Sequence, residues 1–237
     1  MPNTQILRCG VAVLSQVNRQ LGAAMGLLPS VLFRHARTMR EDDETLVPRD
    51  LAGRNTAVHL LSPILNIMLS AASADPITAA PSLIRAWRRA AYMPPISLGD
   101  EKNRRSILPG QSLGLDLETL IHRLATSSAE GCRTRRAFDQ DFRVTLTVSE
   151  ALVATVERPS LGQIDQYDAK RFEETVPERQ NFTLRRRVRQ VVPLRRIVHL
   201  DFSYFEVAAE LWADSLAHGV VYEPSLLEAE MPFGSLR

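Results

Sequence analysis

Apolar residues recur at the spacing of a helix through the first half of the chain and at the spacing of a strand after Phe142. The alternation of Phe142, Val144, Leu146 and Val148 with polar residues predicts a half-buried strand. Residues 152–157 can pair back on it, and a strand over 194–200 leads into a helix over 202–216. The helical spacing predicts further helices over residues 6–17, 18–25, 29–42, 62–72, 80–92 and 116–128.

This order of elements predicts an α+β fold divided into three units. Residues 1–95 are expected to form a mostly helical domain, and residues 96–141 a linker with one amphipathic helix. Residues 142–237 are expected to form a smaller α+β domain with a short antiparallel sheet. Two polar segments without a sustained period predict a turn-like region over 131–141 and a long loop or local disorder over 161–183.

Two of the predicted helices differ in the face that they should bury. In the helix over 80–92, Arg85, Arg88 and Arg89 are expected to face solvent. The helix over 116–128 carries an apolar stripe at helical spacing, which predicts a core position. An exposed stripe would instead indicate a dimer seam, because twofold symmetry matches palindromic DNA sites. The stripe consists of Leu117, Leu120, Ile121 and Leu124.

The stretch from Val17 to Asp42 has the features of two helices joined by a tight turn. Gly26 follows the first helix, at a position where a positive φ is favoured. Pro29 suits the first turn of the second helix, because its missing N–H would have no intrahelical partner there. The second helix has an apolar face with Leu32, Ala36 and Met39. Its opposite face carries Ser30, Phe33, Arg34 and Arg37.

This stretch resembles the helix-turn-helix of DNA-binding proteins, of the kind found in phage and prophage regulators. The family pattern places a small residue in the first helix, a glycine in the turn and an aliphatic residue in the second helix, and Gly22, Gly26 and Leu32 match that spacing. Family members more often have Ala at the first position. The resemblance implies a (winged) helix-turn-helix whose second helix directs Arg34 and its neighbours at base edges and phosphates of double-stranded DNA. An ordinary pair of core helices joined by a glycine turn is the alternative.

The segment after the second helix has the pattern of a wing. Short strand-like runs over 45–48 and 56–61 flank a loop rich in turn formers. Arg49, Arg54 and Asn55 would lie at the tip of this wing, where they can touch phosphate or reach a minor groove. A solvated loop with incidental arginines explains the same residues.

The composition limits the kind of partner. The 237-residue chain has a formal net charge of only +2, so an anionic partner must meet a local basic patch. Cys9 and Cys132 lie in no CxxC or Cys/His cluster, which indicates neither a zinc site nor a disulfide scaffold and fits a reducing cytoplasm. The apolar segment over 56–73 is shorter than the roughly 20 residues that span a bilayer. We therefore expect no membrane segment.

A second basic patch is predicted in the run over residues 183–196. Arg185, Arg187 and Arg189 fall on one face if this run is extended, and they could follow phosphates through counterion release. The alternative is a solvated face of an edge strand. Residues 183–196 contain no aromatic residue that could stack on bases, which disfavours binding to single-stranded nucleic acid.

Sequence motifs for catalysis are absent. The five histidines show no HExxH or HxH spacing, and the chain has no GxSxG, Walker loop or GxGxxG. Asp139 and Asp141 form a DxD pair, but a two-metal nuclease needs further ligands. We therefore expect no enzyme, no cofactor and no metal site.

These features predict a sequence-specific double-stranded DNA-binding protein, a homodimeric transcriptional regulator of phage or prophage type in the cytoplasm. Two alternatives remain. A viral DNA-packaging recognition subunit would assemble as a ring, so a solution mass well above a dimer would favour it. A factor that inhibits a host nucleic-acid enzyme would act through residues 142–237 and would not need Arg34 and Arg37.

Overall fold

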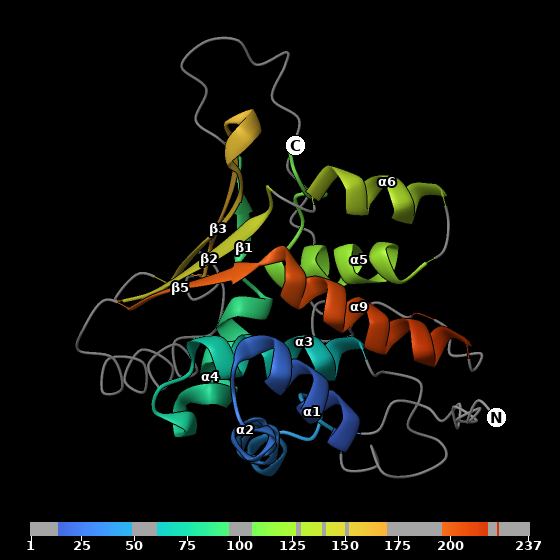
Figure 1. Cartoon of the computed structure of the whole chain (residues 1–237). Coiled ribbons are helices and arrows are strands. Elements are labelled where there is room, and N and C mark those ends of the chain that lie inside the picture. The colour runs from blue at the N-terminus through green and yellow to red at the C-terminus, as the bar shows by residue number, and fades with distance from the viewer. Residues whose placement is uncertain are drawn as a thin grey trace, which may run out of the picture.

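The computed structural model describes residues 14–48, 61–94, 106–126, 129–138, 141–149, 152–169, 196–217 and 222. Over these residues the chain is an α+β protein, as predicted, with helices beside one antiparallel sheet (Figure 1). The α-helices are α1 (Leu14–Met25), α2 (Pro29–Asp42), α3 (Leu61–Ser73), α4 (Ala80–Arg88), α5 (Leu113–Ala125), α6 (Ala129–Phe138) and α9 (Phe202–Ala217). The strands are β1 (Ala91–Met93), β2 (Arg143–Val148), β3 (Val153–Arg158), β4 (Gln163–Asp168) and β5 (Arg196–Asp201). The described residues also include the short 3-10 helices η2 (Ile77–Ala79) and η4 (Pro159–Leu161).

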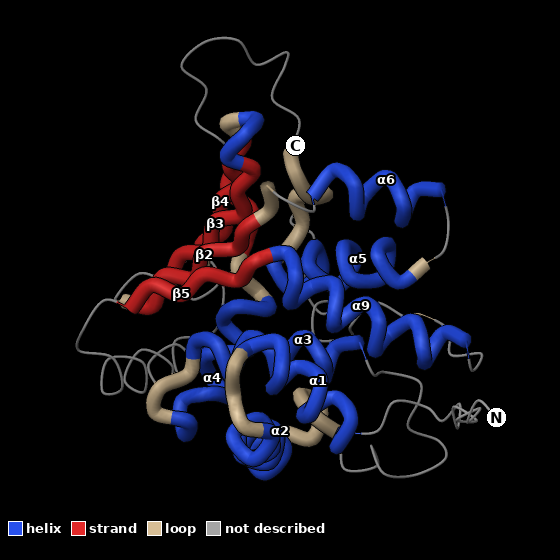
Figure 2. Tube along the Cα trace, viewed as in Figure 1, coloured by secondary structure: helices blue, strands red, loops and turns tan. Residues whose placement is uncertain are grey.

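The described strands form one sheet in the order β1-β4-β3-β2-β5, with antiparallel pairing throughout. β2 and β3 make the predicted hairpin, in which Val144 lies opposite Val156 and Leu146 opposite Ala154. These four side chains are fully buried, because the period of two turns them toward the helices. Figure 2 shows the helices to the right of the sheet and below it. The strands predicted over 142–148, 152–157 and 194–200 are thus confirmed, with small shifts at their ends.

One cluster of buried apolar side chains joins the helices to the sheet. It extends from Val17 on α1 through Leu65 on α3 to Val144 on β2 and Trp212 on α9. Helix α9 packs against both α1 and α5, and it lies between them in Figure 1. β1 follows α4 in the chain, yet it pairs with β4. The boundaries predicted near residues 95 and 141 therefore do not coincide with a break in the described core.

The apolar stripe of α5 lies inside this core. Leu117, Leu120, Ile121 and Leu124 are each at most 2% exposed. They pack on elements of the same chain, so the stripe offers no dimer seam. None of the helices in the described ranges is both long enough and apolar enough to cross a bilayer.

Two predicted helix boundaries were wrong. The break between residues 17 and 18 does not exist, because α1 continues from Leu14 to Met25 and buries Val17, Asn18 and Leu21. The helix predicted to reach residue 92 ends at Arg88, and the chain then enters the sheet as β1. Pairing of Tyr92 with Tyr167 across the β1–β4 ladder replaces another helical turn.

Two elements were missed where the sequence is polar. The region predicted as a turn over 131–141 contains most of α6, which packs on α5. A side chain at Gly131 would collide with the carbonyl oxygens of Arg123 and Thr126, so glycine permits this close approach. The loop predicted from residue 161 contains β4, whose buried residues are Asp165 and Tyr167. Their polar side chains conceal the alternation that identifies a strand.

Arg88 was expected to face solvent and is instead fully buried. Its guanidinium nitrogen Nη2 lies 2.6 Å from Glu118 Oε1, and the two side chains are 0% and 1% exposed. The hydroxyl of Ser62 also donates to Glu118. Because these residues belong to α4, α5 and α3, the ion pair and the hydrogen bond together connect three helices.

Candidate nucleic-acid interface

The connection between α1 and α2 is a complete Schellman turn. The N–H of Leu27 donates to the carbonyl of Gly22 at 2.8 Å, and the N–H of Gly26 donates to the carbonyl of Ala23 at 3.3 Å. Gly26 has a φ of 66°, which confirms its predicted role. A β-carbon at Gly22 would lie 2.8 Å from the carbonyl oxygen of Leu27. Gly22 is therefore the residue that lets this turn close against α1.

Helix α2 begins at Pro29, as predicted, and separates into two faces. Leu32, Ala36 and Met39 are fully buried, which confirms the apolar face. All four residues of the predicted opposite face are exposed, including 49% of Phe33. Leu28, directly before the helix, is 70% exposed. We call Leu28 together with Ser30, Phe33, Arg34 and Arg37 the α2 face.

A buried polar contact holds α2 in this orientation. The imidazole Nδ1 of His35 lies 2.7 Å from the hydroxyl oxygen of Ser70 on α3. Burial, reinforced by the positive charge of Arg34, lowers the pKa of His35 to about 4. His35 is therefore neutral at physiological pH and serves as a hydrogen-bonded core residue. The sequence pattern gave no signal for this contact, because its partner lies 35 residues away.

The charges of this helix pair are segregated along the chain. Residues 14–40 include four arginines and no carboxylate, whereas residues 41–44 are all acidic. Arg37 pairs with Glu41 one turn later, Nε to Oε1 at 2.7 Å, and both side chains are more than 60% exposed. The hydrogen bond to Glu41 raises the pKa of Arg37. Arg34 has no ion pair or hydrogen bond with any of the described residues, so its guanidinium is open to an external partner.

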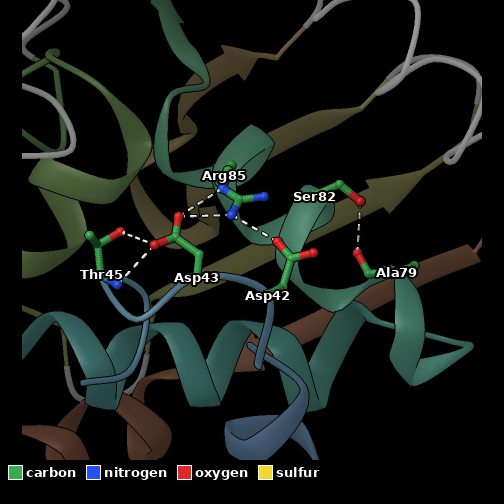
Figure 3. Close-up of polar contacts among 6 residues, drawn as sticks. All are labelled: Asp42, Asp43, Thr45, Ala79, Ser82 and Arg85. Atoms are coloured by element: carbon green, nitrogen blue, oxygen red, sulfur yellow. Dashed lines mark hydrogen bonds and ion pairs between the residues drawn. The ribbon is translucent and has the colours of Figure 1, made fainter. Parts of the chain in front are cut away.

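Arg85 on α4 pairs with two of the four acidic residues. Its Nη2 donates to Asp42 Oδ2 at 2.9 Å and to Asp43 Oδ2 at 2.8 Å (Figure 3). Burial acts to raise the pKa of Asp43, but hydrogen bonds from Arg85 and Thr45 outweigh it and hold that pKa below its usual value. Arg85 was expected to face solvent without a partner. In the structure, its positive charge instead pairs with the carboxylates of Asp42 and Asp43 at the carboxyl end of α2.

The first predicted wing strand, over residues 45–48, is a turn. Asp43 accepts hydrogen bonds from the N–H of Thr45 at 2.9 Å and from its hydroxyl at 2.7 Å (Figure 3). This side-chain turn competes with an extended strand. It also directs Leu46 and Val47 into the core, where both are fully buried. The strand prediction for 45–48 was therefore wrong, because apolar residues that fill a core can do so from a turn.

The other predicted nucleic-acid contacts lie outside the described residues. These are the wing-tip residues Arg49, Arg54 and Asn55 and the second basic patch of Arg185, Arg187 and Arg189. Of the predicted contact residues, the structure places Ser30, Phe33, Arg34 and Arg37, and it brings these four together on one helix face.

A second polar cluster lies between α5 and β4 and is buried. Asp116 accepts a hydrogen bond from the Tyr167 hydroxyl at 2.7 Å and from the N–H groups of residues 110–111, each at 3.0 Å. Asp165 accepts from the Ser106 hydroxyl at 2.8 Å and from the two N–H groups that follow it. Burial raises the pKa of Asp116 despite these donors. The named donors are all protein groups, so the cluster anchors the segment before α5.

Neither chemistry nor resemblance to known proteins assigns a different site. In the part of the chain that the structure describes, no three His, Cys, Asp or Glu side chains come together as metal ligands would. Comparison with protein-family models, with curated proteins and with solved structures found no match to the chain. The functional assignment therefore depends on the α2 face.

Proposed function

We propose that this protein is a sequence-specific double-stranded DNA-binding protein, a cytoplasmic transcriptional regulator of phage or prophage type that binds as a homodimer. The observation that carries the proposal is the α2 face. Two helices joined by a short glycine turn present a second helix whose predicted contact residues are all exposed. Such a helix has the width that the major groove admits.

The charge distribution supports insertion of the amino-terminal part of α2. Its first three turns carry Arg34, Arg37 and Arg40 without a carboxylate, and the acidic residues follow. Of these acidic residues, Glu41 pairs with Arg37, and Asp42 and Asp43 pair with Arg85. Those pairs reduce the repulsion between the carboxyl end of α2 and phosphate. A wing formed by Arg49, Arg54 and Asn55 stays a prediction.

The proposal is tested by selecting duplexes from a random pool with three proteins: wild type, Arg34→Ala and Arg136→Ala. Arg136 is an exposed arginine on α6, which Figure 1 shows on the opposite side of the molecule from α2. Both variants lose one exposed positive charge, so they differ only in position. We expect wild type and Arg136→Ala to enrich the same sequence motif and Arg34→Ala to lose it.

Either of two results would contradict the proposal: no motif enriched by the wild type, or the same motif enriched by all three proteins. A salt series with each variant then shows whether the lost arginine contacted phosphate, because the loss of one phosphate contact lowers the slope of log K against log salt by about 1. If the wild type selects no motif, the exposed apolar pair of Leu28 and Phe33 would favour the alternative of a protein-binding surface.

A further inference from the structure

The α2 face combines an exposed aromatic ring with an exposed guanidinium at adjacent positions. Phe33 is 49% exposed, and it directly precedes Arg34 on a helix whose other side is fixed in the core. Ser30 lies one turn earlier on the same face. Contiguous exposed apolar side chains mark contact surfaces more often than single ones do, and Leu28, 70% exposed, belongs to the same α2 face.

The two arginines of this face are not equivalent. Arg37 is engaged by Glu41 at 2.7 Å, which fixes its guanidinium along the helix. Arg34 makes no such contact within the described ranges. Its positive charge contributes to the lowered pKa of the buried His35. Arg34 is therefore the guanidinium that can present a planar pair of donors to a ligand without first breaking an ion pair.

The major groove offers a matching pair of groups. Guanine presents N7 and O6, which arginine can bind with two parallel hydrogen bonds, and thymine presents a 5-methyl group that fits an apolar side chain. Adjacent residues of a helix rise by about 1.5 Å and base pairs stack at about 3.4 Å, so two neighbouring side chains can reach neighbouring base pairs.

We propose that the DNA site contains a thymine and a guanine on neighbouring base pairs, read by Phe33 and Arg34 respectively. Phe33 packs on the thymine methyl group, Arg34 binds guanine N7 and O6, and Arg37 stays with Glu41 near the phosphate backbone. This inference rests on the proposed function and adds the composition of the site to it.

The test uses the duplex selected from the random pool, with one base changed at a time. Deoxyuridine in place of thymine removes only the methyl group. We expect one such position to weaken wild-type binding about fourfold, the value of one buried methyl group. Phe33→Ala should bind more weakly than wild type and should not distinguish thymine from deoxyuridine. Because Phe33 is exposed, this variant should keep the wild-type circular dichroism spectrum.

A second base change addresses Arg34. 7-Deazaguanine removes the N7 acceptor, and at the neighbouring position we expect about a tenfold loss for wild type and none for Arg34→Ala. Arg37→Ala is the control within the same face: it should weaken all duplexes alike and keep the wild-type ratios for both base changes.

The outcomes separate this inference from the proposed function. A selected motif in which neither base change affects wild-type binding, or affects Phe33→Ala and Arg34→Ala as strongly as wild type, overturns the inference and leaves the proposed function intact. A motif without a thymine beside a guanine does the same. Failure to select any motif overturns both.

Discussion

Arginines have opposite environments in two regions of this protein. On α2, the side chain of Arg37 is 67% exposed and its ion pair with Glu41 connects successive turns of one helix. Between α4 and α5, Arg88 is fully buried and its ion pair with Glu118 connects different helices. Residue type therefore does not separate an arginine at the surface from one that holds the fold. The difference lies in what surrounds each guanidinium.

Breaking the buried pair should have the largest effect on stability. Arg88→Ala leaves the carboxylate of Glu118 buried without its main partner, which we expect to lower the free energy of unfolding by about 3–5 kcal/mol. Urea denaturation of wild type and variant measures this change in the free energy of unfolding. The control is the double variant Arg88→Met with Glu118→Leu, which removes both charges and should recover most of the loss. A single variant that loses less than about 1 kcal/mol would contradict a structural role for this pair.

The Schellman turn should show the next largest effect. Alanine is the better helix former by about 1 kcal/mol, so propensity alone predicts that Gly22→Ala stabilises α1. The collision of its β-carbon with the Leu27 carbonyl should reverse that sign and lower the free energy of unfolding by about 1–3 kcal/mol. Ser15→Ala, at an exposed position of the same helix, should change little. Thermal unfolding of both variants tells whether the collision or the helix propensity dominates. A Gly22→Ala protein that is more stable than wild type would show that the turn can relax.

The buried carboxyl of Asp116 should make stability depend on pH. Its pKa is raised in the folded protein by burial, so the folded state binds this proton more tightly than the unfolded state. Its contribution is complete below the unfolded pKa of about 4 and is lost as the pH rises through the folded pKa. Asp116→Asn should remove this loss on going from acid to neutral pH. Urea titrations of both proteins at several pH values test this, and identical pH profiles would contradict it.

The smallest effect is expected for the exposed pair on α2. Glu41→Ala removes a carboxylate that is mostly in water, so the melting temperature should not change measurably. DNA affinity should rise a few-fold, because the variant frees Arg37 and removes a charge that repels phosphate. Binding at low and high salt checks this, since the gain should shrink as salt screens it. An affinity that falls would mean that Glu41 positions Arg37 productively.

The α2 face could be predicted because its signals are local. Gly26 and Pro29 mark the end of one helix and the start of the next within three residues of each other. The separation of Phe33 and Arg34 from the buried Leu32 then follows from the helical period alone. Strand β2 was predictable for the same reason, since its alternation of apolar and polar residues is unbroken.

Other features depend on partners far along the chain. Arg88 lies in the sequence beside two partly exposed arginines, Arg85 and Arg89, and only the position of Glu118 on α5 shows that it is buried. β4 has no apolar alternation, because its inward positions are filled by Asp165 and Tyr167 and their hydrogen bonds. Such elements follow from tertiary contacts that local pattern does not contain.

The central claim is that the α2 face lies against DNA, and photochemical crosslinking from that face tests it most directly. A photoreactive benzoylphenylalanine replaces Phe33 in one protein and Leu161 in another; these side chains are 49% and 56% exposed. Leu161 belongs to η4, the gold segment far from α2 in Figure 1. With a random duplex pool, we predict crosslinks to DNA from position 33 and none from position 161. No crosslink from position 33, or equal yields from both positions, would contradict the account.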